Sequence, residues 1–242
     1  MWIAHYASGL IAKPFAPRVP LVVLAFAGIA SDALFFVLQM LGIESFNLDT
    51  AIVRSGGCFP YTNDYPLSHS LVGMVAAGVL VAAVYKMVAR VPAPPKDLAV
   101  IVAAAASHFL LEWPSHRHDT KITPGGDALF GAGLFDYPIA VFIAENLLFF
   151  AGLWVYQTFA PPASKAGMQQ HPNLLLIVAL VMVAQQANFC FMAAPTTETR
   201  WVHGPLFLFM ILGSCHLIGM LDGQASSLGF GAKVPEALKK SG

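Results

Sequence analysis

A carboxylate, Asp32, lies in the middle of an apolar run that is long enough to cross a bilayer. The run, residues 19–42, reads VPLVVLAFAGIASDALFFVLQMLG and carries no other charge. A charge at membrane depth costs at least a few kcal/mol unless another group pairs with it or coordinates to it. His69 opens a second apolar run, His108 closes a third, and Glu112 follows one helical turn later. This pattern predicts a metal site at the membrane surface.

The spacing of His108 and Glu112 places both side chains on one helix face, because residues four apart are neighbours on an α-helix. Divalent metals use such pairs readily, since both ligands point at one ion. The stretch WPSHRHD follows directly and adds His116, His118 and Asp119. We interpret Glu112 as a metal ligand and His116 and Asp119 as candidate acid–base groups, although an ordinary solvated loop would also contain such residues.

His69 lies in TNDYPLSHS, with Asp64 five residues earlier and Ser70 directly after it. It could be an interfacial residue, but its membrane level matches that of His108, which favours a shared site. Asp64 is a third candidate acid–base group. Asp32 would be either a ligand itself or the acceptor of a ligand histidine's N–H.

The composition indicates an integral membrane protein. Of 242 residues, 57% are hydrophobic and 11% are charged, and the mean hydropathy is +0.67. A soluble domain would carry about twice that charged fraction. Residues 1–242 are therefore expected to form one membrane domain, and the balance of 13 basic and 13 acidic residues gives no reason to expect a nucleic-acid partner. The three cysteines show no paired spacing, so no disulfide framework is indicated.

Six apolar runs approach the length of about 20 residues that a membrane span needs. They are residues 19–41, 68–88, 98–111, 137–159, 174–192 and 203–221. We predict an all-α, polytopic bundle of about six transmembrane helices. The third run is short, and Glu112 and Trp113 are expected to extend it.

The first twelve residues are apolar but too short to span. We predict a short, half-inserted N-terminal helix that returns at residues 13–18. His5 would then lie inside the bilayer or at its edge. The alternative is an interfacial anchor with an incidental histidine.

Basic residues predict the orientation, because cytoplasmic loops are enriched in Lys and Arg. One side of a six-span bundle holds Lys13, Arg18, Lys86, Arg90, Lys96, Lys165, Lys233, Lys239 and Lys240, and the other holds Arg54, Arg117, Lys121 and Arg200. This bias predicts both termini in the cytoplasm and the loops 42–67 and 112–136 outside.

Other polar residues fall within or beside the apolar runs. Glu145 needs a partner at membrane depth. Interhelical hydrogen bonding is expected of the fifth run's polar residues, which are Gln185, Gln186 and Asn188. His203 and His216 bound the sixth run at opposite levels, and the glycine-rich segment 123–136 is expected to be an outer loop or lid.

The order of these motifs resembles the YbcI/YdjM-like family of membrane-bound metal-dependent hydrolases over residues 1–160; the last two spans, in 161–242, are less distinctive. The family has a histidine on a short first helix, an aspartate on the next helix, a His-Arg-Gly-x-Thr-His-Ser motif and a Ser-His-x-x-x-Asp motif. The matching residues are His5, Asp32 in IASDAL, His69 and Ser70 in DYPLSHS, and His108 and Glu112 in SHFLLE.

The chain departs from the family at three places. Asp64 stands where the first histidine of the third motif is usual, Ala30 and Ser31 replace a Leu-Pro pair, and Glu112 replaces aspartate. The resemblance implies a divalent metal, with zinc the leading candidate, and five ligands: His5, Asp32, His69, His108 and Glu112. It also implies a bacterial cytoplasmic (inner) membrane and a hydrolase activity. The location of the site suggests membrane lipid or another amphiphilic ester or phosphoester as substrate.

Three other functions remain open at this level. Asp32, Glu145 and the histidines could form the relay of an ion, proton or metal transporter, although no inverted repeat is evident. His69 with His108 or His203 could ligate a b-type haem. Finally, a metal ion could staple the helices without any catalysis.

Overall fold

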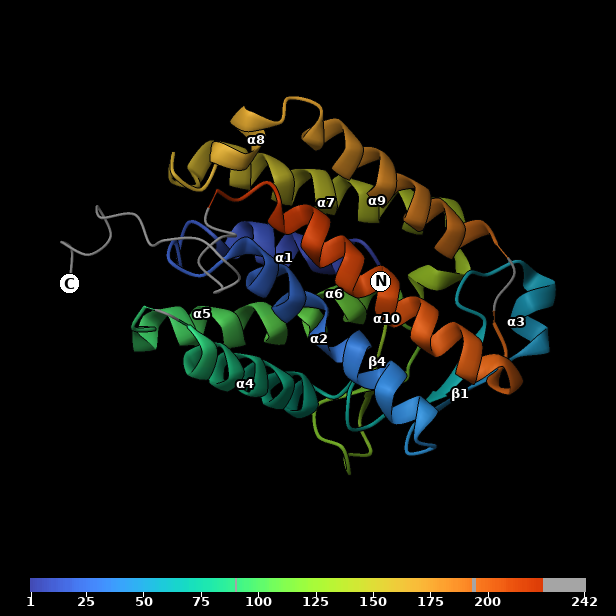
Figure 1. The fold of residues 1–242 in the computed structure, drawn as a ribbon. Coiled ribbons are helices and arrows are strands. Elements are labelled where there is room, and N and C mark those ends of the chain that lie inside the picture. Colours follow the sequence, from blue (N-terminus) through green and yellow to red (C-terminus); the bar gives the residue numbers. More distant parts are fainter. Residues whose placement is uncertain (90, 193–194, 224–242) are drawn as a thin grey trace.

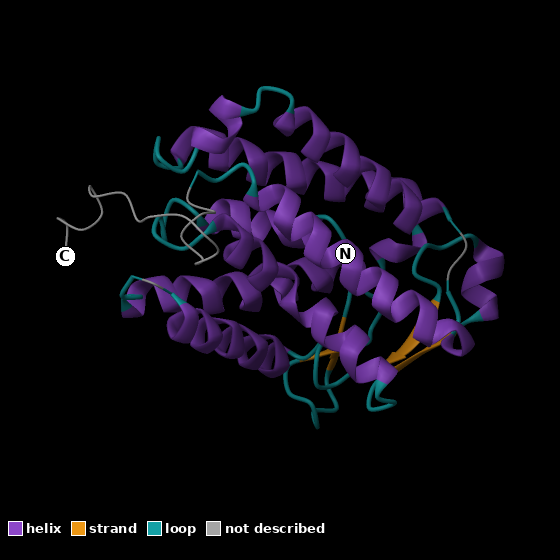
Figure 2. Cartoon of the chain, in the orientation of Figure 1, coloured by secondary structure: helices purple, strands orange, loops and turns teal. Residues whose placement is uncertain are grey.

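The computed structural model describes residues 1–89, 91–192 and 195–223, and these ranges form an all-α bundle (Figures 1 and 2). Six helical segments in them are long and apolar enough to cross a membrane. They are α2 (Leu21–Met40), α4 (Leu71–Val88), α5 continued by α6 (Pro95–Ala106 and His108–Ser115), α7 (Pro138–Phe159), α9 (Leu174–Phe191) and α10 (Arg200–Gly219). The predicted fold class is confirmed, and each span lies within a few residues of the run that predicted it.

The third span is interrupted once. Ser107 separates α5 from α6, and its hydroxyl lies 2.7 Å from both the Ser8 hydroxyl and the Ala104 carbonyl oxygen. Pro95 opens α5 at a position where a missing N–H costs nothing. The predicted extension through Glu112 is confirmed, and α6 presents His108 in its first turn.

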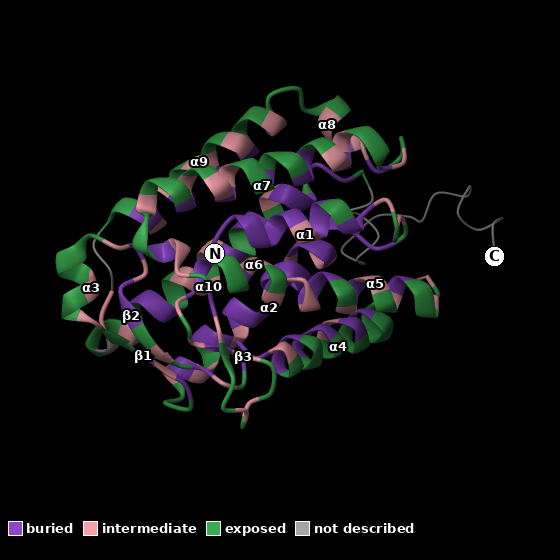
Figure 3. Cartoon of the chain, turned by 180° about the vertical axis from the view of Figure 1, so that it is seen from behind, coloured by how far each residue is buried: buried purple, intermediate pink, exposed green. Residues whose placement is uncertain are grey.

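Helix α1 (Ala4–Ala12) is enclosed by the bundle and contacts α2, α5 and α7 (Figure 3). A Cβ atom on Gly9 would lie 2.4 Å from the Ala25 nitrogen, so the α1 and α2 backbones approach as closely as glycine permits. The Glu145 carboxylate accepts hydrogen bonds from the backbone nitrogens of Trp2 (2.6 Å) and Ala4 (3.3 Å). Glu145 therefore caps the buried start of α1, where backbone N–H groups have no partner within the helix. The short N-terminal helix is inside the protein and is no surface anchor.

Small residues also bring α4 and α5 together. A Cβ atom on Gly78 would lie 2.7 Å from the Cβ of Ala105. Small side chains of this kind let helices in a membrane pack backbone to backbone.

The loops between the spans contain short elements that the hydropathy pattern did not predict. Strands β1 (Ser45–Leu48) and β2 (Tyr61–Asp64) pair antiparallel around α3 (Thr50–Ser55). The remaining short elements are β3 (Thr120–Lys121), β4 (Leu129–Phe130), η1 (Leu134–Asp136), α8 (Ala166–Gln170) and η2 (Thr197–Thr199). In Figure 1, α3 and β1 lie at one end of the bundle and α8 at the other. The glycine-rich segment 123–136 is not entirely an exposed loop, because Phe135 within it is buried.

We expect Gly28→Ala to displace α1 and weaken metal binding at least about tenfold, the scale seen when a ligand's support is lost. A Cβ atom at Gly28 would lie 2.2 Å from the carbonyl oxygen of His5, and the clash is with backbone that has no room to move aside. Gly213→Ala on α10 is the matched control, since no atom of the described residues lies within 4 Å of its added Cβ. Thermal unfolding and metal content measure both effects. Equal metal content in the two variants would contradict the close α1–α2 contact.

Candidate metal centre

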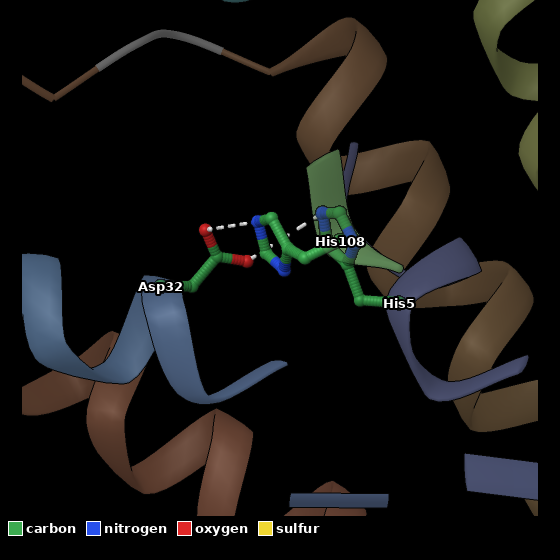
Figure 4. Close-up of side chains that lie close together, drawn as sticks. All are labelled: His5, Asp32 and His108. Atoms are coloured by element: carbon green, nitrogen blue, oxygen red, sulfur yellow. Dashed lines mark ion pairs between the residues drawn. The ribbon is translucent and has the colours of Figure 1, made fainter. Parts of the chain in front are cut away.

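Three side chains from distant parts of the sequence meet inside the bundle: His5 of α1, Asp32 of α2 and His108 of α6 (Figure 4). Each offers one ligand atom, and these atoms all lie within 4.8 Å of one another. The Asp32 carboxylate faces both rings, with Oδ2 3.8 Å from His5 Nε2 and Oδ1 3.6 Å from His108 Nε2. All three residues are buried. This group could hold a metal ion.

The other two predicted ligands adjoin the same group. Glu112 Oε1 lies 2.7 Å from His5 Nε2 and 3.7 Å from His108 Nε2, and the N-terminal ammonium of Met1 forms an ion pair with the same oxygen at 2.5 Å. His69 Nε2 lies 3.1 Å from Asp32 Oδ1. The structure thus brings together His5, Asp32, His69, His108 and Glu112, which we call the His–carboxylate cluster.

The His108 ring is held in a defined tautomer. Its Nδ1 lies 2.9 Å from the carbonyl oxygen of Gly28. A carbonyl oxygen only accepts, so Nδ1 donates the hydrogen and Nε2 of the neutral ring keeps its lone pair. That lone pair faces the carboxylates of Asp32 and Glu112. The ring also stacks on His5, with ring centroids 3.6 Å apart and planes 5° apart.

His69 is oriented by a buried chain of hydrogen bonds. The Ser68 hydroxyl donates to Glu44 Oε2 (2.6 Å) and lies 2.8 Å from His69 Nδ1. Because the Ser68 hydrogen goes to Glu44, Nδ1 of His69 donates and Nε2 again presents a lone pair, here to Asp32. Glu44 is itself fixed by the backbone nitrogens of Leu67 and Ser68, at 2.7 and 2.8 Å.

The lone pair of a neutral imidazole nitrogen repels a carboxylate oxygen that it faces, unless a cation lies between the two atoms. His108 Nε2 and Asp32 Oδ2 are buried and have no hydrogen-bond partner in the described part of the chain. Ligand atoms about 2.1 Å from a tetrahedral ion lie roughly 3.4 Å from each other, close to the 3.6 and 3.8 Å separations at Asp32. The donor set and its spacing therefore fit a divalent metal.

His116 extends the cluster towards the outer loops. Its Nε2 contacts Glu112 Oε2, and its Nδ1 lies 2.9 Å from Asp119 Oδ1 and 2.7 Å from the Tyr65 hydroxyl. Burial disfavours the charged imidazolium, but the carboxylates of Glu112 and Asp119 outweigh it and raise the pKa of His116 to about 9. Burial acts against the charged form of Asp119 too, yet His116 and the amide of Asn63 hold the pKa of that carboxyl below its usual range. His116 thus holds a proton between two carboxylates, which is the geometry of an acid–base group.

Two of the residues singled out beside His69 and His116 lie apart from the cluster. Asp64 is exposed on β2, opposite Ser45, and no hydrogen bond or ion pair joins it to the cluster within residues 1–89, 91–192 and 195–223. It borders a small hollow with His69 and Asp119. His118 is exposed. Ser70 caps α4 by accepting a hydrogen bond from the Gly73 nitrogen (3.1 Å).

The remaining polar residues support the fold. Gln185 donates to the Ser214 hydroxyl of α10 (2.9 Å) and accepts from the Trp2 indole (3.1 Å), which confirms the predicted interhelical hydrogen bonding for this residue. The Gln186 amide donates within α9, to Cys190 Sγ at 3.2 Å. His203 lies 3.3 Å from the Gln39 side-chain oxygen, whereas His216 near the other end of α10 is exposed.

A cavity of about 430 Å³ adjoins the cluster. Its lining includes Asp32, His69, Glu112 and His116, together with aromatic residues of α2, α9, α10 and the outer loops. Hydropathy and motif spacing gave no sign of it, because its walls come from many separate parts of the chain, from Met1 to Phe207.

Sequence reasoning also missed Ser68, Glu44 and Tyr65, which position the histidines. We expect Ser68→Ala to weaken metal binding by roughly 10- to 100-fold, because partners of ligand histidines have effects of that size. Ser55→Ala is the matched control, since its hydroxyl is exposed and donates to the Ile52 carbonyl oxygen of its own helix. A competition titration with a chelating dye measures both affinities, and an unchanged affinity in the Ser68 variant would contradict the orienting role.

No protein-family model, curated protein or solved structure matches this chain. The resemblance to the YbcI/YdjM-like hydrolases therefore stays a prediction that rests on the motifs and on the order in which they occur.

Proposed function

We propose that this protein is a membrane-embedded, metal-dependent hydrolase that acts on amphiphilic esters or phosphoesters at the outer bilayer surface. One observation carries the proposal. Four imidazoles, including that of His116, direct Nε2 atoms at two buried carboxylates beside a cavity of small-molecule size.

The His–carboxylate cluster would hold the metal. Imidazole nitrogens and carboxylate oxygens are the usual donors of zinc in catalytic sites, so zinc is the ion that we propose. When bound, such an ion lowers the pKa of a coordinated water towards about 7 and polarises the bond to be cleaved.

The chain's own residues would handle the proton. Asp119 accepts from Nδ1 of His116 and so keeps Nε2 directed at the cluster, where it can take or give a proton. Tyr65 donates to Asp119 at 3.1 Å and completes this support. Asp64, which is exposed, could act only from the rim of the site.

We further propose a bacterial inner membrane with both termini in the cytoplasm, which places the cluster near the outer surface. The basic-residue bias supports this orientation. Five of the nine residues on the proposed cytoplasmic side are described, and Arg90, Lys233, Lys239 and Lys240 lie outside the described residues.

Three observations favour an enzyme over the alternatives. A metal staple needs no adjoining cavity, whereas the cavity here reaches the cluster itself. A transport relay through Glu145 would compete with its hydrogen bonds to Trp2 and Ala4. A haem between His69 and His108 would have to displace Asp32, which lies against both Nε2 atoms.

Hydrolysis of chromogenic substrates tests the proposal. Purified protein in lipid nanodiscs is given nitrophenyl acyl esters of graded chain length and a bis-nitrophenyl phosphodiester. We expect turnover that a chelator removes, that zinc restores and that the His108→Ala variant lacks. If the metal-loaded protein hydrolyses none of the substrates faster than this variant does, hydrolysis is refuted. The metal would then only hold the helices together.

A further inference from the structure

We propose that the cavity beside the cluster binds one acyl chain of an uncharged amphiphile and places its ester or amide carbonyl at the cluster. This inference rests on the proposed function, because it names the substrate class of the same site. It separates carboxylic esters and amides from phosphoesters, which the location of the cluster alone does not do.

The inner end of the cavity is polar and its walls are aromatic. Asp32, His69, Glu112 and His116 line the end at the cluster. The walls are formed by phenylalanines from separate elements, including Phe36 of α2, Phe46 of β1, Phe189 of α9 and Phe207 of α10. A ligand that fits both surfaces has a polar reactive group at one end and a hydrocarbon body.

The walls are held in place by one another. Phe36 and Phe207 stack with ring centroids 4.8 Å apart, and Phe46 packs on Tyr61 with centroids 4.3 Å apart. Aromatic pairs of this kind add stability beyond the area that they bury. The hydrocarbon surface is therefore formed before any ligand arrives, which reduces the cost of ordering it on binding.

The charges around the cavity argue against a phosphate group. Among the described lining residues none is Lys or Arg, while two are carboxylates. The other cationic groups of the lining are already paired, the Met1 ammonium with Glu112 and His116 with Glu112 and Asp119. Arg117, on the loop after α6, is committed to Asp136 at 2.8 Å and to the Phe59 carbonyl oxygen at 3.0 Å. Sites for phosphoesters usually supply Arg or Lys to the phosphate oxygens, so a neutral carbonyl compound fits this lining better.

The volume of the cavity limits the length of the acyl chain that it can hold. A group of the size of a water molecule takes about 30 Å³, and the cavity has about 430 Å³. It therefore holds on the order of a dozen methylene-sized groups, which matches one medium-length acyl chain.

The mouth of the cavity is apolar and faces outward. Val53 of α3, Phe191 of α9 and Met192 line it and are 48%, 55% and 66% exposed. In Figure 1, α3 lies beside the end of α9, at the same end of the bundle as β1. A chain can enter there from the outer leaflet without crossing a polar barrier.

Quenching of the fluorescence of Trp2, which lines the cavity, tests the proposal by ligand binding without any turnover. The other three tryptophans, Trp113, Trp154 and Trp201, are exposed and are replaced by phenylalanine. The protein in phosphatidylcholine nanodiscs is titrated with a dibrominated dodecyl glycerol ether, which is uncharged and cannot be hydrolysed as an ester. The matched probe is the phosphate monoester of the same ether.

We expect saturable quenching by the uncharged ether and half-saturation at least tenfold higher for the phosphate probe. Val53→Phe at the mouth should raise the half-saturation for the ether, whereas Val79→Phe on the exposed face of α4 should not. Three results would each overturn the proposal: quenching that does not saturate, a phosphate probe that binds as tightly as the ether, or equal binding in the two variants. Since no turnover is needed, saturable binding without hydrolysis of the matching ester would refute the enzyme and keep the acyl-chain site.

Discussion

Replacing His108 or His69 by alanine is expected to abolish metal retention. Each ring presents Nε2 to Asp32, and each is held by its own support, the Gly28 carbonyl oxygen or the Ser68 hydroxyl. Each variant removes one imidazole ligand and so weakens the binding of the ion. We therefore expect the ion to dissociate during purification. Elemental mass spectrometry should find about one to two divalent ions per chain in the unaltered protein, since hydrolase sites use one or two metals, and almost none in either variant.

The matched control is His216→Ala, because His216 is exposed on α10 and carries the same side chain. It should retain the full metal content. A thermal unfolding curve for each variant shows whether the bundle is still folded when the metal is lost. Full occupancy in both the His69 and His108 variants would refute the ligand assignment.

The buried charge made the site predictable. Asp32 in an apolar run needed a partner, and histidines at the ends of two other runs were the nearest candidates in membrane level. The spacing of His108 and Glu112 placed both on one helix face, and both do face the cluster. Such predictions succeed because a membrane span has few polar residues, so each buried polar side chain has few possible partners.

The remaining parts depend on packing that no local pattern encodes. The depth of His5 could not be derived from the length of the first helix; it follows from Gly9 and Gly28, which let α1 lie against α2. Glu44 falls within the predicted outer loop 42–67, yet it is buried and accepts a hydrogen bond from Ser68. Asp64, five residues before His69, is turned outward by its pairing in β2, because neighbouring residues of a strand point to opposite faces.

The position of His5 also depends on an ion pair at the other end of α1. Lys13 Nζ lies 2.6 Å from Asp222 Oδ2 and 2.7 Å from the Val19 carbonyl oxygen, and both charged side chains are fully buried. The Leu21 nitrogen donates to the same Asp222 oxygen at 2.8 Å. The pair therefore ties the return of α1 and the start of α2 to the segment just after α10.

Asp222→Ala is expected to destabilise the protein by about 3–5 kcal/mol, the usual cost of leaving a buried charge without its partner. Equilibrium unfolding in mixed micelles measures the loss. Asp136→Asn is the control, because its pair with Arg117 is partly exposed, and such pairs contribute about 1 kcal/mol or less.

The double variant Lys13→Met with Asp222→Ala separates charge from packing. In Asp222→Ala the Lys13 ammonium is buried without its partner. The double variant has no such charge, so it should be more stable than Asp222→Ala alone. It should also bind metal better than the single variant, since α1 would return to its place and carry His5 back to Glu112. If the single and double variants were equally destabilised, the buried lysine would not be the source of the cost, and the link between this pair and the metal centre would fail.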